Sequence, residues 1–136
     1  MKYEPKLIEF AQKGDERGYL VVCEGSGKDI PFEIKRIFYI YGSDKDVVRG
    51  QHANKYTDFV LINVAGTSKV KVRDGKGLEK VFSLERPHTG IFIPHMVWKD
   101  MYDFSDDSVL LCLASTHYDN EEYIRDYEEF VKLVNS

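Results

Sequence analysis

Short apolar runs, separated by turn-forming residues, recur along the whole chain. Their lengths and their content of Val, Ile, Phe and Tyr are typical of β-strands. The segments between them, such as GSGKD, YGSDKD and ERPHTG, consist of loop-forming residues. This spacing predicts an all-β jelly-roll barrel, with strands at Tyr19 to Cys23, Phe32 to Tyr41, Asp58 to Val64, Ser68 to Arg73, Val81 to Leu84, Gly90 to Ile93 and Val109 to Ala114.

The C-terminal stretch DNEEYIRDYEEFVKLV has a helical period instead. Its apolar and aromatic residues recur at intervals of three and four, which predicts one amphipathic helix packed on the barrel. Asp119 with Glu122 three residues later resembles a capping box and predicts that the helix begins there. Asp74-Gly75 predicts a hairpin turn, because Gly supplies the positive φ that a tight turn needs.

Composition and length indicate a single domain over residues 1–136 with a net charge of -4. The acidic balance gives no overall basic surface for nucleic acid. No stretch has the ~18 apolar residues of a membrane span, and the charged N-terminus excludes the apolar core of a signal peptide. Cys23 and Cys112 lie far apart, as expected of buried thiols in a reducing compartment. We therefore expect a soluble, cytoplasmic protein without membrane or nucleic-acid partners.

The segment RGQHANK places His52 and Asn54 on one strand face. With Asp58 and Gly66 it repeats the spacing of the first cupin motif, in which a second His is expected at the position of Asn54. Pro94, with Lys99 near the expected His position, resembles the second cupin motif. One imidazole and one carboxylate are too few donors for a transition metal, and a protonated amine would repel the ion. We expect no metal and a His52 that is free to move protons, or else a buried structural histidine.

Several blocks in order carry a wider resemblance: DERGYL, IPFEIKRIFYIYG, RGQHANK, AGTSKVKVRDG, IFIPHMVWKDMYDFS and LASTHYDNEEYIRDYEEF. Together they cover residues 6–133 and resemble the sugar-nucleotide 3,4-ketoisomerases. These are RmlC-like cupins that convert TDP-4-keto-6-deoxyglucose into a TDP-3-keto-6-deoxyhexose. The resemblance implies a jelly-roll homodimer, often with exchanged N-terminal strands, and a TDP-linked keto-deoxysugar at the barrel mouth. It also implies that no metal or other cofactor is needed, and a role in deoxysugar biosynthesis for lipopolysaccharide or another glycan.

This chain departs from the usual family block at Asn54, at Phe59, where a Gln is expected, and at Lys99, where His or Arg is common. The isomerisation needs a base at C3 and a proton donor at C4. His52 is the candidate base, and Asn54 can position the sugar but cannot act as a base. The candidates for the second group are Tyr39, Lys99 and His95, with Arg17 as a cationic stabiliser. Tyr39 could equally be barrel packing, and Lys99 a solvated rim charge.

The diphosphate of a nucleotide sugar requires cations, and Arg49 is the first candidate because Gly50 permits close approach. Lys35, Arg36 and Arg125 are further candidates, although Arg125 could instead pair with helix carboxylates. Phe59, His95 and Trp98 complete the predicted substrate-binding set. The alternative hypothesis is a nucleotide-sugar-binding cupin that has lost turnover, since residue 54 is not titratable.

Overall fold

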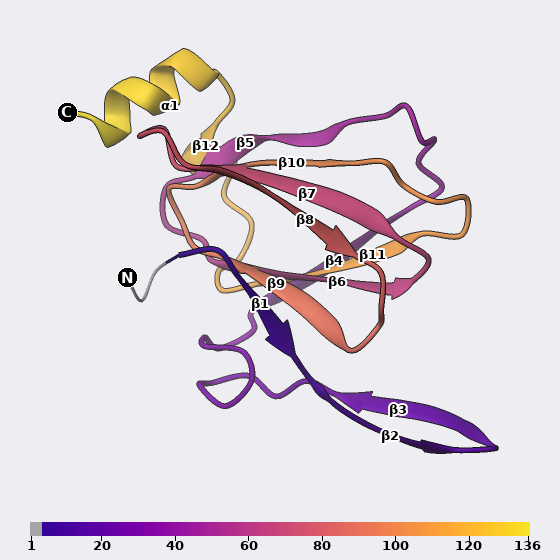
Figure 1. The fold of residues 1–136 in the computed structure, drawn as a ribbon. Coiled ribbons are helices and arrows are strands. Elements are labelled where there is room, and N and C mark those ends of the chain that lie inside the picture. Colours follow the sequence, from indigo (N-terminus) through magenta and orange to yellow (C-terminus); the bar gives the residue numbers. More distant parts are fainter. Residues whose placement is uncertain (1–3) are drawn as a thin grey trace.

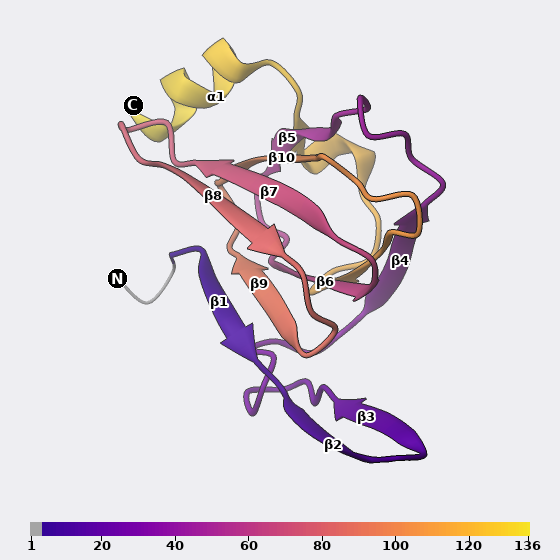
Figure 2. The ribbon, with the colours of Figure 1, turned by 45° about the vertical axis from the view of Figure 1, so that its right-hand side comes forward.

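Two five-stranded antiparallel sheets form the body of the protein, for which the computed structural model describes residues 4–136 (Figure 1). In spatial order the first sheet contains β1 (Lys6–Glu9), β9 (Thr89–Ile93), β6 (Phe59–Ala65), β11 (Val109–Ala114) and β4 (Arg36–Tyr41). The second contains β12 (Tyr123–Ile124), β5 (Arg49–Asn54), β10 (Trp98–Tyr102), β7 (Ser68–Arg73) and β8 (Glu79–Leu84). The turned view shows the two sheets facing each other (Figure 2). The predicted jelly roll is confirmed.

The space between the sheets is filled by alternate residues of the strands. Phe59 and Leu61 of β6 pack there with Val70 and Val72 of β7. The intervening residues of β6 lie on the outer face in a second apolar cluster, which contains Phe10, Ile30, Val60, Ile62, Phe92 and Leu113. Because both faces of β6 are buried, its sequence is a continuous apolar run rather than an alternating one.

The hairpin of β2 (Ala11–Asp15) and β3 (Gly18–Val22) extends away from the barrel (Figures 1 and 2). The sequence predicted β3 but not β2, because every residue of β2 is exposed and the strand has no apolar alternation. Strand β10 was also missed, since its buried sequence WKDMY includes two charged residues. Each miss has the same origin: these strands are formed by pairing with neighbours rather than by a local pattern.

The C-terminal prediction was right about a helix but wrong about where it begins. Helix α1 spans Tyr127–Val134, and the Asp126 carboxylate accepts a hydrogen bond from the N–H of Glu128. The preceding residues form a 3₁₀ turn, η1 (Asn120–Glu122), and then β12. The helical period is interrupted because Tyr123 and Ile124 pair with β5.

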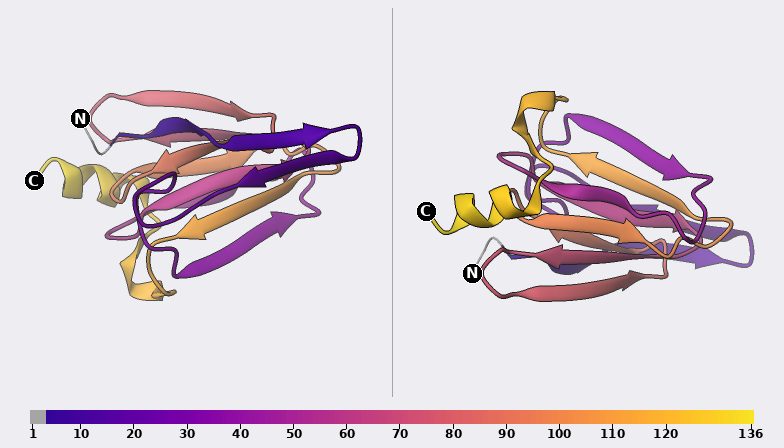
Figure 3. Two further views of the ribbon diagram at one scale, coloured as in Figure 1. Left: turned by 90° about the horizontal axis from the view of Figure 1, so that it is seen from below. Right: turned by 90° about the horizontal axis from the view of Figure 1, so that it is seen from above.

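The predicted capping box is also corrected. The Asp119 side chain accepts a hydrogen bond from the N–H of Glu121, so it caps the 3₁₀ turn and not a long helix. Helix α1 lies at one end of the sandwich (Figure 3). There Phe130 packs with Trp98, Ile124 and Ala53. Among residues 4–136, no helix is long and apolar enough to cross a membrane.

The predicted turn at Asp74-Gly75 joins β7 to β8, with Gly75 at φ +76. A Cβ on Gly75 would lie 2.6 Å from Val134 Cγ2 and 3.0 Å from Phe130 Cε2 of α1. We expect Gly75→Ala to lower the free energy of unfolding by ~1–3 kcal/mol. It should also change the fluorescence of Trp98, because α1 is pushed away from the tryptophan that it covers.

Gly77→Ala is the matched control for this prediction. Gly77 also has positive φ, +106, but a Cβ there meets nothing within 4 Å. Urea unfolding followed by fluorescence measures both variants. An unchanged emission spectrum in Gly75→Ala would contradict the role assigned to this close contact.

Candidate active site

A β-bulge in β5 sets the direction of the His52 side chain. In the pairing of β10 with β5, Lys99 lies opposite His52 and Asp100 opposite Gly50, which leaves Gln51 as the extra residue. Gly50 and Gln51 both have positive φ, +83 and +57. A Cβ on Gly50 would lie 3.0 Å from the carbonyl oxygen of Lys99, so glycine is required at this point. Bulges of this kind redirect side chains beside functional sites.

The register places His52 and Lys99 directly opposite each other on adjacent strands, and both line one cavity. Directly opposed side chains have Cβ atoms about 4.5–5.5 Å apart. The cavity lies in the barrel and has a volume of about 200 Å³. It is lined by Phe38, Tyr39, Ile40, Arg49, Gly50, His52, Phe59, Leu61, Lys99, Met101, Cys112 and Tyr123.

The half-buried imidazole of His52 is a neutral base. Its Nδ1 lies 2.9 Å from the Gly50 carbonyl oxygen, which can only accept, so Nδ1 carries the hydrogen and Nε2 is the basic nitrogen. Burial, and then the positive charge of Lys99, lower the pKa of His52 to about 3. The imidazole is therefore unprotonated throughout the neutral range.

Lys99 is the buried amine of the site, with only 3% of the residue exposed. Its Nζ donates a hydrogen bond to Asn54 Oδ1 at 3.0 Å and lies 4.2 Å from the centroid of the Phe59 ring. Burial lowers the pKa of Lys99 to about 7. Near neutral pH this group can therefore both donate and accept a proton. The alternative of a solvated rim charge is excluded by this burial.

Asn54 lies behind Lys99 rather than on the cavity wall. It is 1% exposed, and its Oδ1 accepts from the lysine while its Nδ2 has no hydrogen-bond partner among residues 4–136. An amide oxygen accepts equally from an ammonium and from a neutral amine. Asn54 can therefore hold Lys99 in either protonation state.

Aromatic and other apolar side chains make up much of the remaining cavity lining. Burial raises the pKa of the Cys112 thiol to about 12, so it remains protonated and inert. The Tyr123 ring packs edge-on to His52 with centroids 4.8 Å apart. In the described part of the chain, no three His, Cys, Asp or Glu side chains gather as metal ligands would.

Positive charge dominates the surroundings of the cavity. Arg49 lines it, and Arg125 lies 4.7 Å from the centroid of the Tyr123 ring. Arg36 stacks on Phe38 at 5.5 Å, and its buried Nε and Nη2 have no partner among the described residues. Such a site suits an anionic ligand.

Several of the predicted site residues lie away from this cavity or are turned from it. Tyr39 borders the cavity but is 61% exposed and packs on Tyr41, on the face of β4 opposite Phe38. This orientation gives the ring a packing role within one chain. Arg17 lies at the tip of the β2–β3 hairpin, where it pairs with Asp15 at 2.7 Å.

His95 and Trp98 also lie elsewhere. His95 Nδ1 is 2.8 Å from Asp58 Oδ1 on the exposed β9–β10 connection. The Trp98 indole packs under α1, with its ring centroid 5.1 Å from that of Tyr127. Lys35 is exposed beside β4. Alternation along β10 explains Trp98, since its neighbour Lys99 faces the cavity.

Tyr123 is the wall residue that the sequence analysis missed as a site residue. The sequence analysis assigned Tyr123 to the helix. In the structure it pairs with Asn54 of β5, and its ring lies against His52. Its neighbour Glu122 was assigned only a capping role. The unbroken stretch of helix-forming residues masked both, and no local signal marked the two-residue strand.

A jelly-roll barrel with an imidazole and a buried amine on one cavity wall defines this chain as a small cupin protein. The family model FdtA, described as WxcM-like, C-terminal, matches residues 3–135, so the chain belongs to this family. It is 40% identical over 131 residues to a TDP-4-oxo-6-deoxy-α-D-glucose-3,4-oxoisomerase from Aneurinibacillus thermoaerophilus, covering 96% of this chain and 93% of that protein. The resemblance to the 3,4-ketoisomerases is confirmed.

Solved structures agree with this assignment. A 3,4-ketoisomerase from Helicobacter canadensis is 44% identical with a TM-score of 0.93, and 98% of each chain is covered. A histidine-to-asparagine mutant of the 3,4-ketoisomerase QdtA from Thermoanaerobacterium thermosaccharolyticum, solved with TDP-4-keto-6-deoxyglucose, is 39% identical. Its TM-score is also 0.93, and the match covers 99% of this chain and 96% of that chain.

Proposed function

We propose that this protein is a TDP-4-keto-6-deoxyhexose 3,4-ketoisomerase. The observation that carries the proposal is the pairing of a neutral His52 with a buried Lys99, opposite each other on one cavity wall. Membership of a family whose relatives bear this activity supplies the substrate class. The reaction is an internal exchange of a carbonyl and an alcohol, so it needs proton transfer and no external oxidant.

The chemistry follows from the states of the two groups. His52 Nε2 removes the proton from C3, which the neighbouring carbonyl acidifies, and the electron pair forms the C3–C4 double bond of an enediolate with its charge on O4. The Lys99 ammonium stabilises that oxygen. Transfer of the O3 hydrogen to O4 and delivery of a proton to C4 then give the 3-keto sugar. Lys99 is therefore the second proton-transfer group that Asn54 cannot be.

Arginine side chains at the cavity can bind the diphosphate of the substrate. Arg49 lines the cavity and is the first candidate for a phosphate contact, followed by Arg125 beside Tyr123. Arg36 is a further candidate, because its buried Nε and Nη2 have no hydrogen-bond partner among residues 4–136. Its positive charge also acts on Lys99 in the cavity. The Phe59 ring forms part of the apolar floor on which the sugar would rest.

The direct test is incubation of the purified protein with TDP-4-keto-6-deoxyglucose in deuterium oxide, followed by NMR. Isomerisation should produce a TDP-3-keto-6-deoxyhexose that carries deuterium from solvent. Absence of both product and exchange, with this and related 4-keto nucleotides, would refute the proposal.

A binding protein without turnover is the second candidate function. Asn54 supports it, because the side chain holds Lys99 without being titratable itself. TDP binding in calorimetry combined with no exchange at C3 would favour this candidate. Measurable turnover that depends on His52 would exclude it.

We also propose that the protein acts as a homodimer. The outer face of β4 exposes Ile37, Tyr39 and Tyr41 at 60%, 61% and 72%, and the nearby hairpin exposes Tyr19 and Leu20 at 76% and 58%. Apolar surface of this kind is characteristic of an interface. Exchange of the N-terminal strands would cover it. Sedimentation equilibrium should give twice the chain mass, and a monomer would contradict the proposal.

The cellular setting that we propose is deoxysugar supply for lipopolysaccharide or another glycan, in the cytoplasm. Free Cys23 and Cys112 agree with a reducing compartment. Fractionation of the native cells tests the location. Loss of the deoxysugar from surface glycans after gene deletion tests the role.

A further inference from the structure

Lys99 is a buried amine without a carboxylate partner. Among residues 4–136 it is the only buried lysine, and none of the ion pairs in this part of the chain includes it. Lysine is almost never fully buried unless it is paired, because an unpaired charge away from water is costly. An amine in this position loses its proton readily, which makes it a nucleophile.

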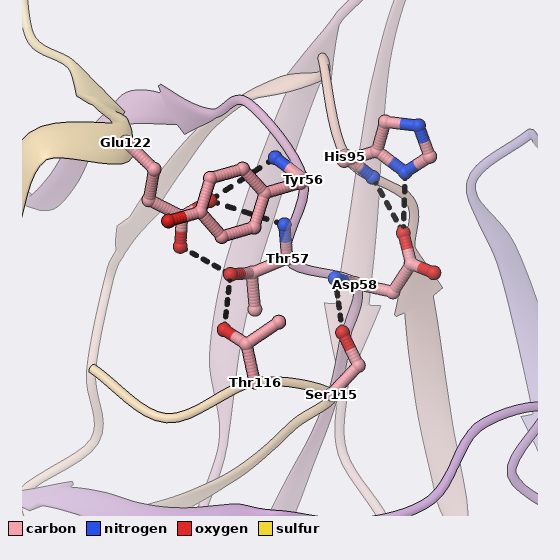
Figure 4. Close-up of polar contacts among 7 residues, drawn as sticks. All are labelled: Tyr56, Thr57, Asp58, His95, Ser115, Thr116 and Glu122. Atoms are coloured by element: carbon pink, nitrogen blue, oxygen red, sulfur yellow. Dashed lines mark hydrogen bonds and ion pairs between the residues drawn. The ribbon is translucent and has the colours of Figure 1, made fainter. Parts of the chain in front are cut away.

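Both buried carboxylates among the described residues are bound elsewhere. Asp100 pairs with an arginine of β7 at 3.2 Å. Glu122 Oε1 accepts hydrogen bonds from the N–H groups of Tyr56 and Thr57, each at 3.1 Å, and the Thr57 hydroxyl donates to Oε2. Figure 4 shows the Glu122 carboxylate directed at this turn. Neither carboxylate therefore holds the Lys99 proton through a direct contact.

The contacts of the Lys99 amine leave its lone pair available. Its Nζ donates to Asn54 Oδ1 at 3.0 Å, and no other hydrogen bond joins it to the residues described. The Phe59 ring, with its centroid 4.2 Å from Nζ, and Met101 present apolar surface in the same cavity. A neutral amine can keep its donation to Asn54 and still attack a ligand with its lone pair. Desolvation of a lysine by an apolar pocket is a known means of activating it as a nucleophile.

We propose that Lys99 captures the carbonyl carbon of a ligand in the cavity and forms an imine with it. The ligand class is a ketone or aldehyde whose reacting part fits a cavity of about 200 Å³. The identification of the carbonyl as C4 of a TDP-4-keto sugar rests on the proposed function. The reactivity of Lys99 toward a small carbonyl compound does not.

The capture requires no oxidant and no cofactor. The Nζ lone pair forms a bond to the carbonyl carbon, and the π electron pair moves to the oxygen. His52 Nε2, on the strand opposite Lys99, carries a proton from the nitrogen to this oxygen and so gives a carbinolamine. It then carries the second proton in the same way, so that the hydroxyl leaves as water while the nitrogen lone pair forms the C=N bond.

The imine lies beside the isomerisation and not on its path. The isomerisation leaves a hydroxyl on C4, whereas the same proton transfers on an imine would leave an amine there, still bound to Lys99. The ammonium form of Lys99 therefore serves the isomerisation. The neutral form gives the imine, which water hydrolyses back to amine and ketone.

The test is reductive trapping of the wild-type protein near neutral pH. Sodium cyanoborohydride is added with either TDP-4-keto-6-deoxyglucose or acetaldehyde. Hydride adds to the imine carbon and gives a stable secondary amine, whose mass is that of the protein plus the carbonyl compound less one oxygen atom. Mass spectrometry of the peptides locates it. The sugar nucleotide should label Lys99, and isomerase activity should be lost in step with this labelling.

Lys69 is the internal control for the acetaldehyde reaction, because its side chain is 44% exposed. We expect Lys99 to be alkylated ~10-fold or more faster than Lys69. Burial lowers the pKa of Lys99 to about 7, whereas an ordinary lysine is almost entirely protonated at neutral pH. In guanidinium chloride the two lysines should react at similar rates, since the burial that activates Lys99 is lost. Lys99→Arg, which keeps a cation but cannot form an imine, should give no sugar-nucleotide adduct.

The inference is overturned if Lys99 reacts no faster than Lys69 in the folded protein and carries no sugar-nucleotide adduct, even where the isomerase is active. Selective acetaldehyde labelling of Lys99 in a protein without isomerase activity would support the inference and refute the proposed function. Acetaldehyde labelling without a sugar-nucleotide adduct would support the reactive amine and refute C4 as the carbonyl that it captures.

Discussion

Replacing His52 by alanine should lower kcat for the isomerisation by ~10²–10⁴, the loss typical of removing a general base. The bulge at Gln51 aims this side chain into the cavity, and the Gly50 carbonyl fixes the tautomer that presents Nε2. No other described side chain on the cavity wall is a neutral base in the same place. Steady-state turnover and deuterium uptake at C3 are the measurements.

The shape of the pH profile gives an independent check on His52. Because burial lowers its pKa to about 3, its base form persists down to acidic pH. The kcat/KM of the wild type should therefore not show an acid limb near pH 6.5, the ordinary value for histidine. His117→Gln, which alters an exposed histidine, should retain wild-type kcat. Equal C3 exchange in wild type and His52→Ala would remove His52 from the mechanism, provided that both proteins bind TDP in calorimetry.

Replacing Lys99 by methionine should have two large and opposite effects. Turnover should fall by ~10²–10⁴, because the enediolate loses the cation that stabilises it and no group remains to deliver the proton to C4. The free energy of unfolding at pH 6–7 should rise by ~2–4 kcal/mol. Burial of a charged amine is costly, and this gain exceeds the loss of its hydrogen bond to Asn54.

The sign of the stability effect depends on pH. The pKa of Lys99 is lower in the folded protein, about 7, than its ordinary value of 10.5. Between these values the unfolded chain binds more protons, so the wild type gains stability as pH rises through this window. Lys99→Met lacks this rise, and its advantage should shrink toward pH 10. Urea unfolding across pH 6–10 measures the difference.

Lys69→Met provides the matched control for this substitution. Its side chain is 44% exposed and pairs loosely with Asp103 at 3.4 Å. We expect stability within ~0.5 kcal/mol of wild type and unchanged turnover. A destabilised Lys99→Met at pH 6, or one with wild-type kcat, would contradict the assignment of Lys99 as a buried proton-transfer group.

The pattern of residues within one segment was enough to predict those strands and turns whose structure depends mainly on their own sequence. The strand predicted at Phe32 to Tyr41 contains β4 (Arg36–Tyr41), whose side chains alternate between half-buried and exposed. The hairpin at Gly75 was also right, because a left-handed backbone restricts the residue types that fit. Period and turn chemistry are properties of neighbouring residues, so they can be recognised before folding.

The polar sites were less predictable because they depend on partners distant in sequence. Lys99 appeared equally suited to a rim, and only the register with His52 shows it buried on the cavity wall. His95 and Trp98 occupy the same sequence block as Lys99 but lie outside the cavity, since the chain turns at the β9–β10 connection. Successive residues of a strand point to opposite faces of the sheet, so a difference of one position decides whether a side chain reaches the cavity.

The sequence alone was enough to predict the jelly-roll class, the terminal helix, the family and the candidacy of His52, because these depend on composition, period and residue spacing within short blocks. The tertiary structure decided the rest: the bulge that aims His52, the burial that lowers the pKa of Lys99, and the enclosure of Glu122. Desolvation and strand register arise only when distant segments pack together, and they determine which side chains can move protons.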